Sequence, residues 1–137
     1  MKTIDMQDIR HLNLFEKITH VRTRLCFIYN NAIIFCVPKT MVSKAIGENG
    51  KNIRKINEVL RKKIKVVSSP QGTVEIKKFI EMIVSPVTFK DLEIKDNEII
   101  LTAGSYSKAM LIGRNKRRLH ELQKITRDYF GKDLSIV

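Results

Sequence analysis

An internal repeat restricts the fold of this chain more than any other feature of its sequence. Segment 43–56 aligns with segment 109–122 at an offset of 66 residues, in a chain of 137 residues. The matched pairs are Ile46 with Ile112, Gly47 with Gly113, Asn49 with Asn115, Ile53 with Leu119, and Ile56 with Leu122. An offset near half the chain length indicates a duplication. We therefore expect two small domains, residues 1–72 and residues 73–137, each of a size that can still fold.

The same order of elements is predicted in both halves. The first half indicates a helix over 3–19, strands over 24–29 and 32–37, a helix over 40–46, another helix after Gly50 and a strand over 64–67. The second half indicates a helix over 73–85, strands over 89–95 and 98–103, helices over 105–112 and 117–130, and a strand over 133–137. Each half is thus an α+β domain, helix–strand–strand–helix–helix–strand, with a three-stranded sheet packed on helices.

The first two strands are predicted to form a tight hairpin. The dipeptide Asn30-Asn31 tolerates the positive φ angles that a two-residue turn needs, and this turn pairs Tyr29 with Ala32. In that register Cys26 and Cys36 lie on opposite faces of the hairpin. Their spacing fits no metal-binding motif, so we expect two buried free thiols.

The positive charge of the chain is concentrated in the two copies of the repeat. The formal net charge is +12, from 26 Lys and Arg against 14 Asp and Glu. Window 39–65 contributes +7 and window 108–127 contributes +6, which leaves −1 for all other residues. A charge of this size on a small domain indicates a polyanionic partner, and its distribution places that partner at the repeat.

Several other classes of protein are disfavoured. The sequence has no apolar run of transmembrane length and no apolar stretch typical of a signal peptide, so we expect a cytoplasmic protein without a membrane partner. Segment 47–51 resembles the end of a phosphate-binding P-loop, but Ala45 and Asn52 stand where that motif needs Gly and Ser or Thr. We expect the scattered histidines at the surface or half-buried; they are His11, His20 and His120. We therefore expect no enzymatic activity, no small-molecule substrate, no cofactor and no metal.

The repeat contains a helix–GxxG–helix pattern with a specific physical use. Gly47 lets one helix stop abruptly, and Gly50 lets the backbone come close to a ligand at the start of the next helix. The unpaired N–H groups and the dipole at that helix start suit a phosphate. Lys44, Lys51 and Arg54 are predicted to surround the loop, beside apolar side chains that would support unstacked bases.

The segments 45–53 and 111–119 resemble the GxxG regions of KH domains, and the order of elements is that of type II KH domains. Two such domains in tandem resemble the archaeal NusA-like transcription factors, and so does the order of the stretch 14–19, the hairpin over 26–37 and the first helix pair. This resemblance implies loops that clamp about four nucleotides of single-stranded RNA or DNA. It also implies a role in transcription termination or antitermination, in contact with nascent RNA and with RNA polymerase or its elongation complex. The implied RNA-binding residues are Lys44, Ile46, Gly47, Glu48, Asn49, Gly50, Lys51 and Arg54 in the first half, and Lys108, Gly113, Arg114, Asn115, Lys116 and Arg117 in the second.

Both loops depart from the common KH pattern. The first loop has no basic residue between its glycines, and the second has Lys116 in place of the closing glycine. A β-carbon there could hinder close approach of the backbone, or the amine could add a phosphate contact. We expect the first domain to bind RNA more typically. We also expect Gly47→Asp combined with Gly50→Asp to abolish most binding of single-stranded RNA without unfolding the domain.

Two other functions remain open from the sequence. One is a ribosome-associated or ribosome-assembly KH protein that binds ribosomal RNA, which co-sedimentation with ribosomal subunits would favour. The other is a protein–protein adaptor whose KH folds no longer bind RNA, which RNA binding with a flat salt dependence would favour.

Overall fold

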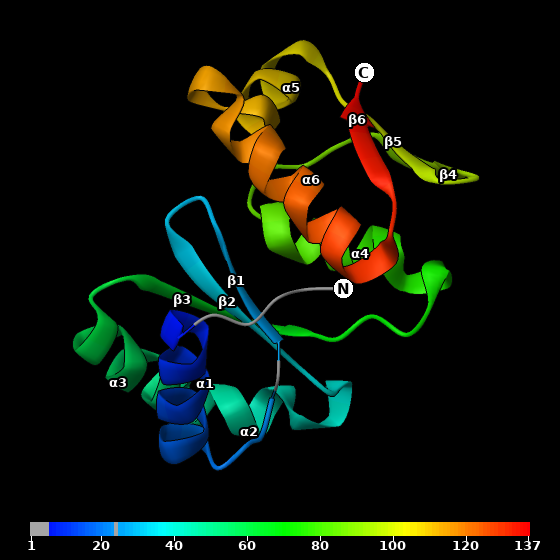
Figure 1. Cartoon of the computed structure of the whole chain (residues 1–137). Coiled ribbons are helices and arrows are strands. Elements are labelled where there is room, and N and C mark those ends of the chain that lie inside the picture. The colour runs from blue at the N-terminus through cyan, green and yellow to red at the C-terminus, as the bar shows by residue number, and fades with distance from the viewer. Residues whose placement is uncertain (1–5, 24) are drawn as a thin grey trace. The chain divides into compact units, whose positions relative to one another are not determined.

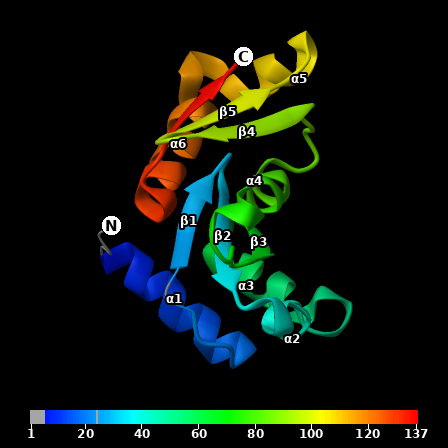
Figure 2. The same ribbon diagram turned by 90° about the vertical axis from the view of Figure 1, so that its right-hand side faces the viewer.

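The computed structural model describes residues 6–23 and 25–137, and their contacts divide into two compact units. The first unit ends at Pro70, and the second runs from Gln71 to Val137. Each unit is a three-stranded sheet with helices packed against it (Figures 1 and 2). The domain boundary expected between residues 72 and 73 stays a prediction.

The first unit has the predicted order of elements. They are α1 (Met6–Thr19), β1 (Leu25–Tyr29), β2 (Ala32–Val37), α2 (Val42–Ile46), α3 (Lys51–Leu60) and β3 (Lys63–Ser68). Short 3-10 turns over Lys39–Met41 and Glu48–Gly50 precede α2 and α3. The first residues of the predicted helix over 3–19 and the first residue of the predicted strand over 24–29 lie outside the described residues.

The second unit repeats this order. Its elements are α4 (Ile76–Val84), β4 (Asp91–Lys95), β5 (Glu98–Thr102), α5 (Ser105–Ile112), α6 (Arg117–Phe130) and β6 (Asp133–Ile136). Short 3-10 turns over Thr73–Glu75 and Arg114–Lys116 precede α4 and α6. The repeated order confirms the predicted α+β fold class, although α4 and β4 begin later than expected.

The sheets of the two units share one topology. In the first unit β1 pairs with β2 antiparallel, and β2 pairs with β3 parallel; in the second, β4, β5 and β6 pair in the same way. Asn30 and Asn31 have φ angles of 50° and 61°, and Tyr29 lies opposite Ala32, which confirms the predicted hairpin. Cys26 lies opposite Phe35. It therefore projects from the other face of the sheet than Cys36, the next residue along β2.

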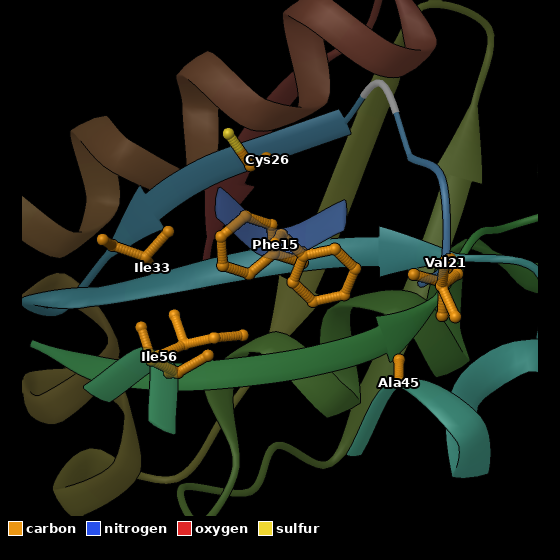
Figure 3. Close-up of a cluster of buried hydrophobic side chains, with 9 residues drawn as sticks. Phe15, Val21, Cys26, Ile33, Ala45 and Ile56 are labelled. Carbon is orange, nitrogen blue, oxygen red and sulfur yellow. The ribbon is translucent and has the colours of Figure 1, made fainter. Parts of the chain in front are cut away.

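The core of the first unit forms where α1 and α3 pack against the sheet. The rings of Phe15 on α1 and Phe35 on β2 stack with their centroids 4.3 Å apart. Figure 3 shows this cluster, in which Ile56 of α3 lies close to Ile33 of β2. In the second unit Phe79 of α4 is similarly buried. These aromatic residues are part of the hydrophobic cores of the two units.

One expectation about burial is wrong. His11 was expected at the surface or half-buried, but only 8% of it is exposed, because it lies on the face of α1 that carries Phe15. On α3, by contrast, Val59 is 59% exposed. The inward stripe of that helix is narrow and runs through Ile53, Ile56 and Leu60.

Candidate nucleic-acid interface

The first loop, Gly47–Gly50, connects the end of α2 directly to the start of α3. Gly47 has φ 81° and ψ 164°, Asn49 has φ 56° and ψ 28°, and Gly50 has φ 72° and ψ 20°. The N–H of Gly47 donates to the carbonyl of Ser43 at 3.0 Å, which closes α2. The N–H of Gly50 donates to the carbonyl of Gly47 at 3.1 Å. These torsions reverse the chain within one turn, so that α3 begins at Lys51.

The second loop, Gly113–Lys116, has the same backbone conformation. Gly113 has φ 74° and ψ 173°, Asn115 has φ 56° and ψ 28°, and Lys116 has φ 59° and ψ 24°. Lys116 thus adopts the left-handed conformation that Gly50 has in the first loop, at a cost of about 1–2 kcal/mol for a residue with a β-carbon. The loss of the closing glycine therefore leaves the path of the loop unchanged.

The first glycine of each loop is covered by a side chain from the start of the following helix, which reaches back to the end of the preceding helix. In the first unit the amide nitrogen of Asn52 donates to the carbonyl of Lys44 at 3.2 Å. A β-carbon on Gly47 would lie 2.9 Å from the Asn52 side chain, whereas one on Gly50 would meet only the guanidinium of Arg54, at 3.7 Å. A side chain at Gly47 is therefore strained, whereas the expectation that Asp at both glycines leaves the domain folded stays a prediction.

In the second unit Arg118 makes the contacts that Asn52 makes in the first. Its guanidinium donates to the carbonyl of Met110 at 3.0 Å, and a β-carbon on Gly113 would lie 2.9 Å from its Cγ. Asn52 and Arg118 are 66 residues apart, the offset of the repeat. Neither was predicted from the sequence, because the two residue types differ and only the loop torsions bring them over the glycine.

Both loops lie at the surface, where a ligand can reach them. Among the predicted site residues, the exposed ones are Lys44, Glu48, Asn49, Lys51, Arg54, Arg114, Asn115, Lys116 and Arg117. The half-buried ones are Ile46, Gly47, Gly50, Lys108 and Gly113. The structure thus brings together the residues of each loop and of the following helix start. Lys108 is the exception, because it lies in the first half of α5, five residues before the second loop.

The loops differ in charge more than in shape. Glu48 in the first loop corresponds to Arg114 in the second, and both are exposed. Arg54 donates a hydrogen bond from its guanidinium to the carbonyl of Asn49, so this cation is held against the first loop. The second loop, by contrast, carries a cation at its closing position, Lys116. The two loops therefore present one backbone geometry with different electrostatic potentials.

The ion pairs seen within residues 6–23 and 25–137 lie away from the loops. They join Lys77 with Asp91, Lys95 with Glu93, and Arg127 with Asp133. The exposed cations of the loops are thus not neutralised by these pairs. The first N–H of each following helix is already paired, because Lys51 donates to the carbonyl of Glu48 and Arg117 donates to the carbonyl of Arg114. The positive end of the helix dipole and the exposed cations nearby are the features of each helix start that favour a phosphate.

The family model for the KH domain matches residues 9–86, more than half of the chain. The chain therefore belongs to the KH-domain family, whose members bind nucleic acid through a GxxG loop. Its curated relatives are archaeal proteins that carry the name "Probable transcription termination protein NusA".

The most completely aligned of these relatives comes from Halococcus morrhuae. It is 23% identical over 134 residues, which cover 96% of this chain and 94% of the relative. The relatives from Methanococcus vannielii and Methanocaldococcus jannaschii are 27% and 28% identical. Their alignments cover 67% and 65% of this chain but only 51% and 47% of the relatives, so the chain spans about half the length of these two proteins.

A solved structure has the same fold. The crystal structure of APE1850 superposes with a TM-score of 0.70 at 21% identity, and the match covers 98% of this chain and 100% of that chain. Within the described residues, no helix combines the length and the apolar character needed to cross a bilayer.

Proposed function

We propose that this protein binds single-stranded RNA with its two loops and acts in transcription termination or antitermination. The observation that carries the proposal is the repetition of one exposed loop geometry at the start of α3 and of α6, each within a strongly basic segment. The KH family and the names of the relatives support an RNA-binding protein rather than an enzyme. They also support contact with RNA polymerase or its elongation complex.

In this mechanism the RNA backbone lies against the loop. Phosphates interact with the cations at the starts of α3 and α6 and with the positive end of each helix dipole. About four unstacked nucleotides then extend along α2 or α5. The half-buried side chain of Ile46 lies at the end of α2 next to the loop, where it can contact a base.

The sharpest test adds negative charge to the loops without touching the glycines. Asn49→Asp and Asn115→Asp place a carboxylate on each loop, at exposed positions whose left-handed torsions Asp tolerates. A carboxylate about 5 Å from a phosphate costs about 1–3 kcal/mol at an effective dielectric of 80 to 20, or roughly a 5- to 150-fold loss of affinity. We expect the double variant to lose at least this much in a filter-binding titration with single-stranded RNA.

Asn31→Asp is the matched control. Asn31 is also exposed, has a positive φ of 61° and undergoes the same change of charge, but it lies in the β1–β2 turn. We expect its RNA affinity to equal that of the wild type. Equal affinities for the double variant and this control would contradict the proposed RNA site.

A separate experiment distinguishes the biological role. We expect the tagged wild-type protein to co-purify with RNA polymerase from cells, and the loop variant to lose the RNA-dependent part of this association. Co-sedimentation with ribosomal subunits instead would favour the ribosome-associated alternative and overturn the role in transcription. Neither outcome changes the prediction for binding of isolated RNA.

A further inference from the structure

A cluster of three metal-ligating side chains lies in the first unit, on elements that do not form the loop. Asp8 and His11 come from α1, and Cys26 comes from β1. Their ligand atoms all lie within 4.8 Å of one another, and the Cys26 Sγ is 3.9 Å from an Asp8 carboxylate oxygen. These positions match no linear metal-binding motif, so only the folded chain reveals the cluster.

The packing of α1 on the sheet explains why the three side chains meet. Phe15 of α1 stacks on Phe35 of β2, and Cys26 lies directly opposite Phe35 on the neighbouring strand. His11 is four residues before Phe15 and therefore lies on the same face of the helix, one turn away. Asp8 precedes His11 by three residues on that face. Figure 3 shows Cys26 and Phe15 in the same buried cluster.

We propose that Asp8, His11 and Cys26 bind one zinc-like divalent transition metal ion. Cysteine sulfur, histidine nitrogen and a carboxylate oxygen are the ligands that zinc uses in proteins, and three of them leave a fourth tetrahedral position for water. Magnesium and calcium would be disfavoured, because these hard cations prefer sites made of oxygen alone.

The charge of this three-residue cluster and its access to solvent both suit a divalent metal ion. On binding, the Cys26 thiol releases its proton to solvent, and the thiolate and the Asp8 carboxylate together balance the 2+ charge of the metal while His11 stays neutral. Cys26 and His11 are 1% and 8% exposed, whereas Asp8 is only half-buried. The ion can therefore enter past the carboxylate and reach two protected ligands. The bound metal would join α1 to β1 and stabilise the first unit.

Cobalt(II) is the probe for this site, because its bonds to thiolate and its tetrahedral coordination both produce characteristic absorption bands. We expect the full-length reduced protein, freed of metal with a chelator, to bind one Co²⁺ per chain with a thiolate-to-cobalt band in the near ultraviolet. Addition of Zn²⁺ should displace the cobalt and raise the midpoint of thermal unfolding.

The variants Cys26→Ser, His11→Gln and Asp8→Asn remove one ligand each. We expect Cys26→Ser to lose the charge-transfer band and all three to lose the zinc-dependent rise in the unfolding midpoint. Cys36→Ser is the matched control, because Cys36 is also a buried cysteine outside any disulfide but projects from the other face of the sheet. This variant should keep the band and the rise.

Substitution of the buried Cys26 or His11 could unfold the domain, and Asp8→Asn keeps the test valid in that case. Asp8 is only half-buried, and asparagine has nearly the same shape as aspartate. The far-ultraviolet circular dichroism of Asp8→Asn should match the wild type without metal. The proposal is overturned if the wild type gives no thiolate-to-cobalt band. A folded Asp8→Asn protein that responds to zinc as the wild type does would also overturn the assigned ligand set.

Discussion

The two glycines of the first loop should differ strongly in their tolerance of alanine. Gly47 combines a positive φ with ψ 164°, a region of backbone conformation that is essentially restricted to glycine and costs other residues about 1–3 kcal/mol. Its new β-carbon would also displace the Asn52 side chain, whose hydrogen bond to Lys44 contributes about 0.5–1.5 kcal/mol. We expect Gly47→Ala to lower the free energy of unfolding by about 2–4 kcal/mol.

Gly50→Ala is the comparison. This residue has left-handed torsions that cost alanine about 1–2 kcal/mol, partly offset by the lower entropy of the unfolded chain. Its β-carbon would approach only the end of the flexible Arg54 side chain. We therefore expect a loss of about 1 kcal/mol.

Urea unfolding of the full chain, followed by circular dichroism, measures the difference. With a slope of about 2 kcal/mol per molar urea, Gly47→Ala should lower the midpoint of the affected transition by about 1–2 M, and Gly50→Ala by about 0.5 M. Gly113→Ala should behave like Gly47→Ala, because Arg118 lies over it in the same way. Equal midpoints for Gly47→Ala and Gly50→Ala would refute the argument from the Asn52 contact.

The remaining predictions concern binding and pH. Lys116→Gly should keep the second unit folded, because glycine adopts the same torsions freely, but should weaken RNA binding in a filter assay through loss of an exposed cation. On β3, burial and then the neighbouring Lys63 lower the pKa of Lys65 from 10.5. The unfolded chain therefore holds this proton more tightly, so stability should rise as the pH rises toward 10.5, and urea unfolding of Lys65→Met should lack that contribution. For roughly 4–8 phosphates contacted, the logarithm of the RNA association constant should fall with the logarithm of salt concentration at a slope of about −3 to −6.

Local patterns in the sequence were sufficient to predict the framework of both units. The Asn30-Asn31 turn fixed the register of the first hairpin, because a two-residue turn leaves one pairing for the flanking residues. The match of Gly47 with Gly113 predicted that both units place a loop between two helices. These features depend on neighbouring residues and on periodicity, which a single sequence contains.

Contacts between distant residues could not be predicted in the same way. The burial of His11 follows from the rotation of α1 about its axis, which the stacking of Phe15 on Phe35 determines. The contacts of Asn52 and Arg118 over the loops depend on torsions that become apparent only in three dimensions. Asn52 and Arg118 occupy equivalent positions and cover the first glycine of each loop in the same way. Their residue types differ, so the sequence repeat gives no sign of this shared contact.

The charge difference between the loops gives a reciprocal test of RNA binding by each unit. Glu48 and Arg114 occupy equivalent exposed positions next to loops of equal conformation, so exchanging their charges changes electrostatics and little else. If Arg114 contacts a phosphate, Arg114→Glu should make the salt slope less steep by about 0.7, and Glu48→Arg should make it steeper by a similar amount when it gains a contact. Circular dichroism should show both variants folded. Wild-type slopes in both variants would mean that RNA binds away from these loops, whereas a change in Arg114→Glu alone would assign the phosphate contacts to the second unit.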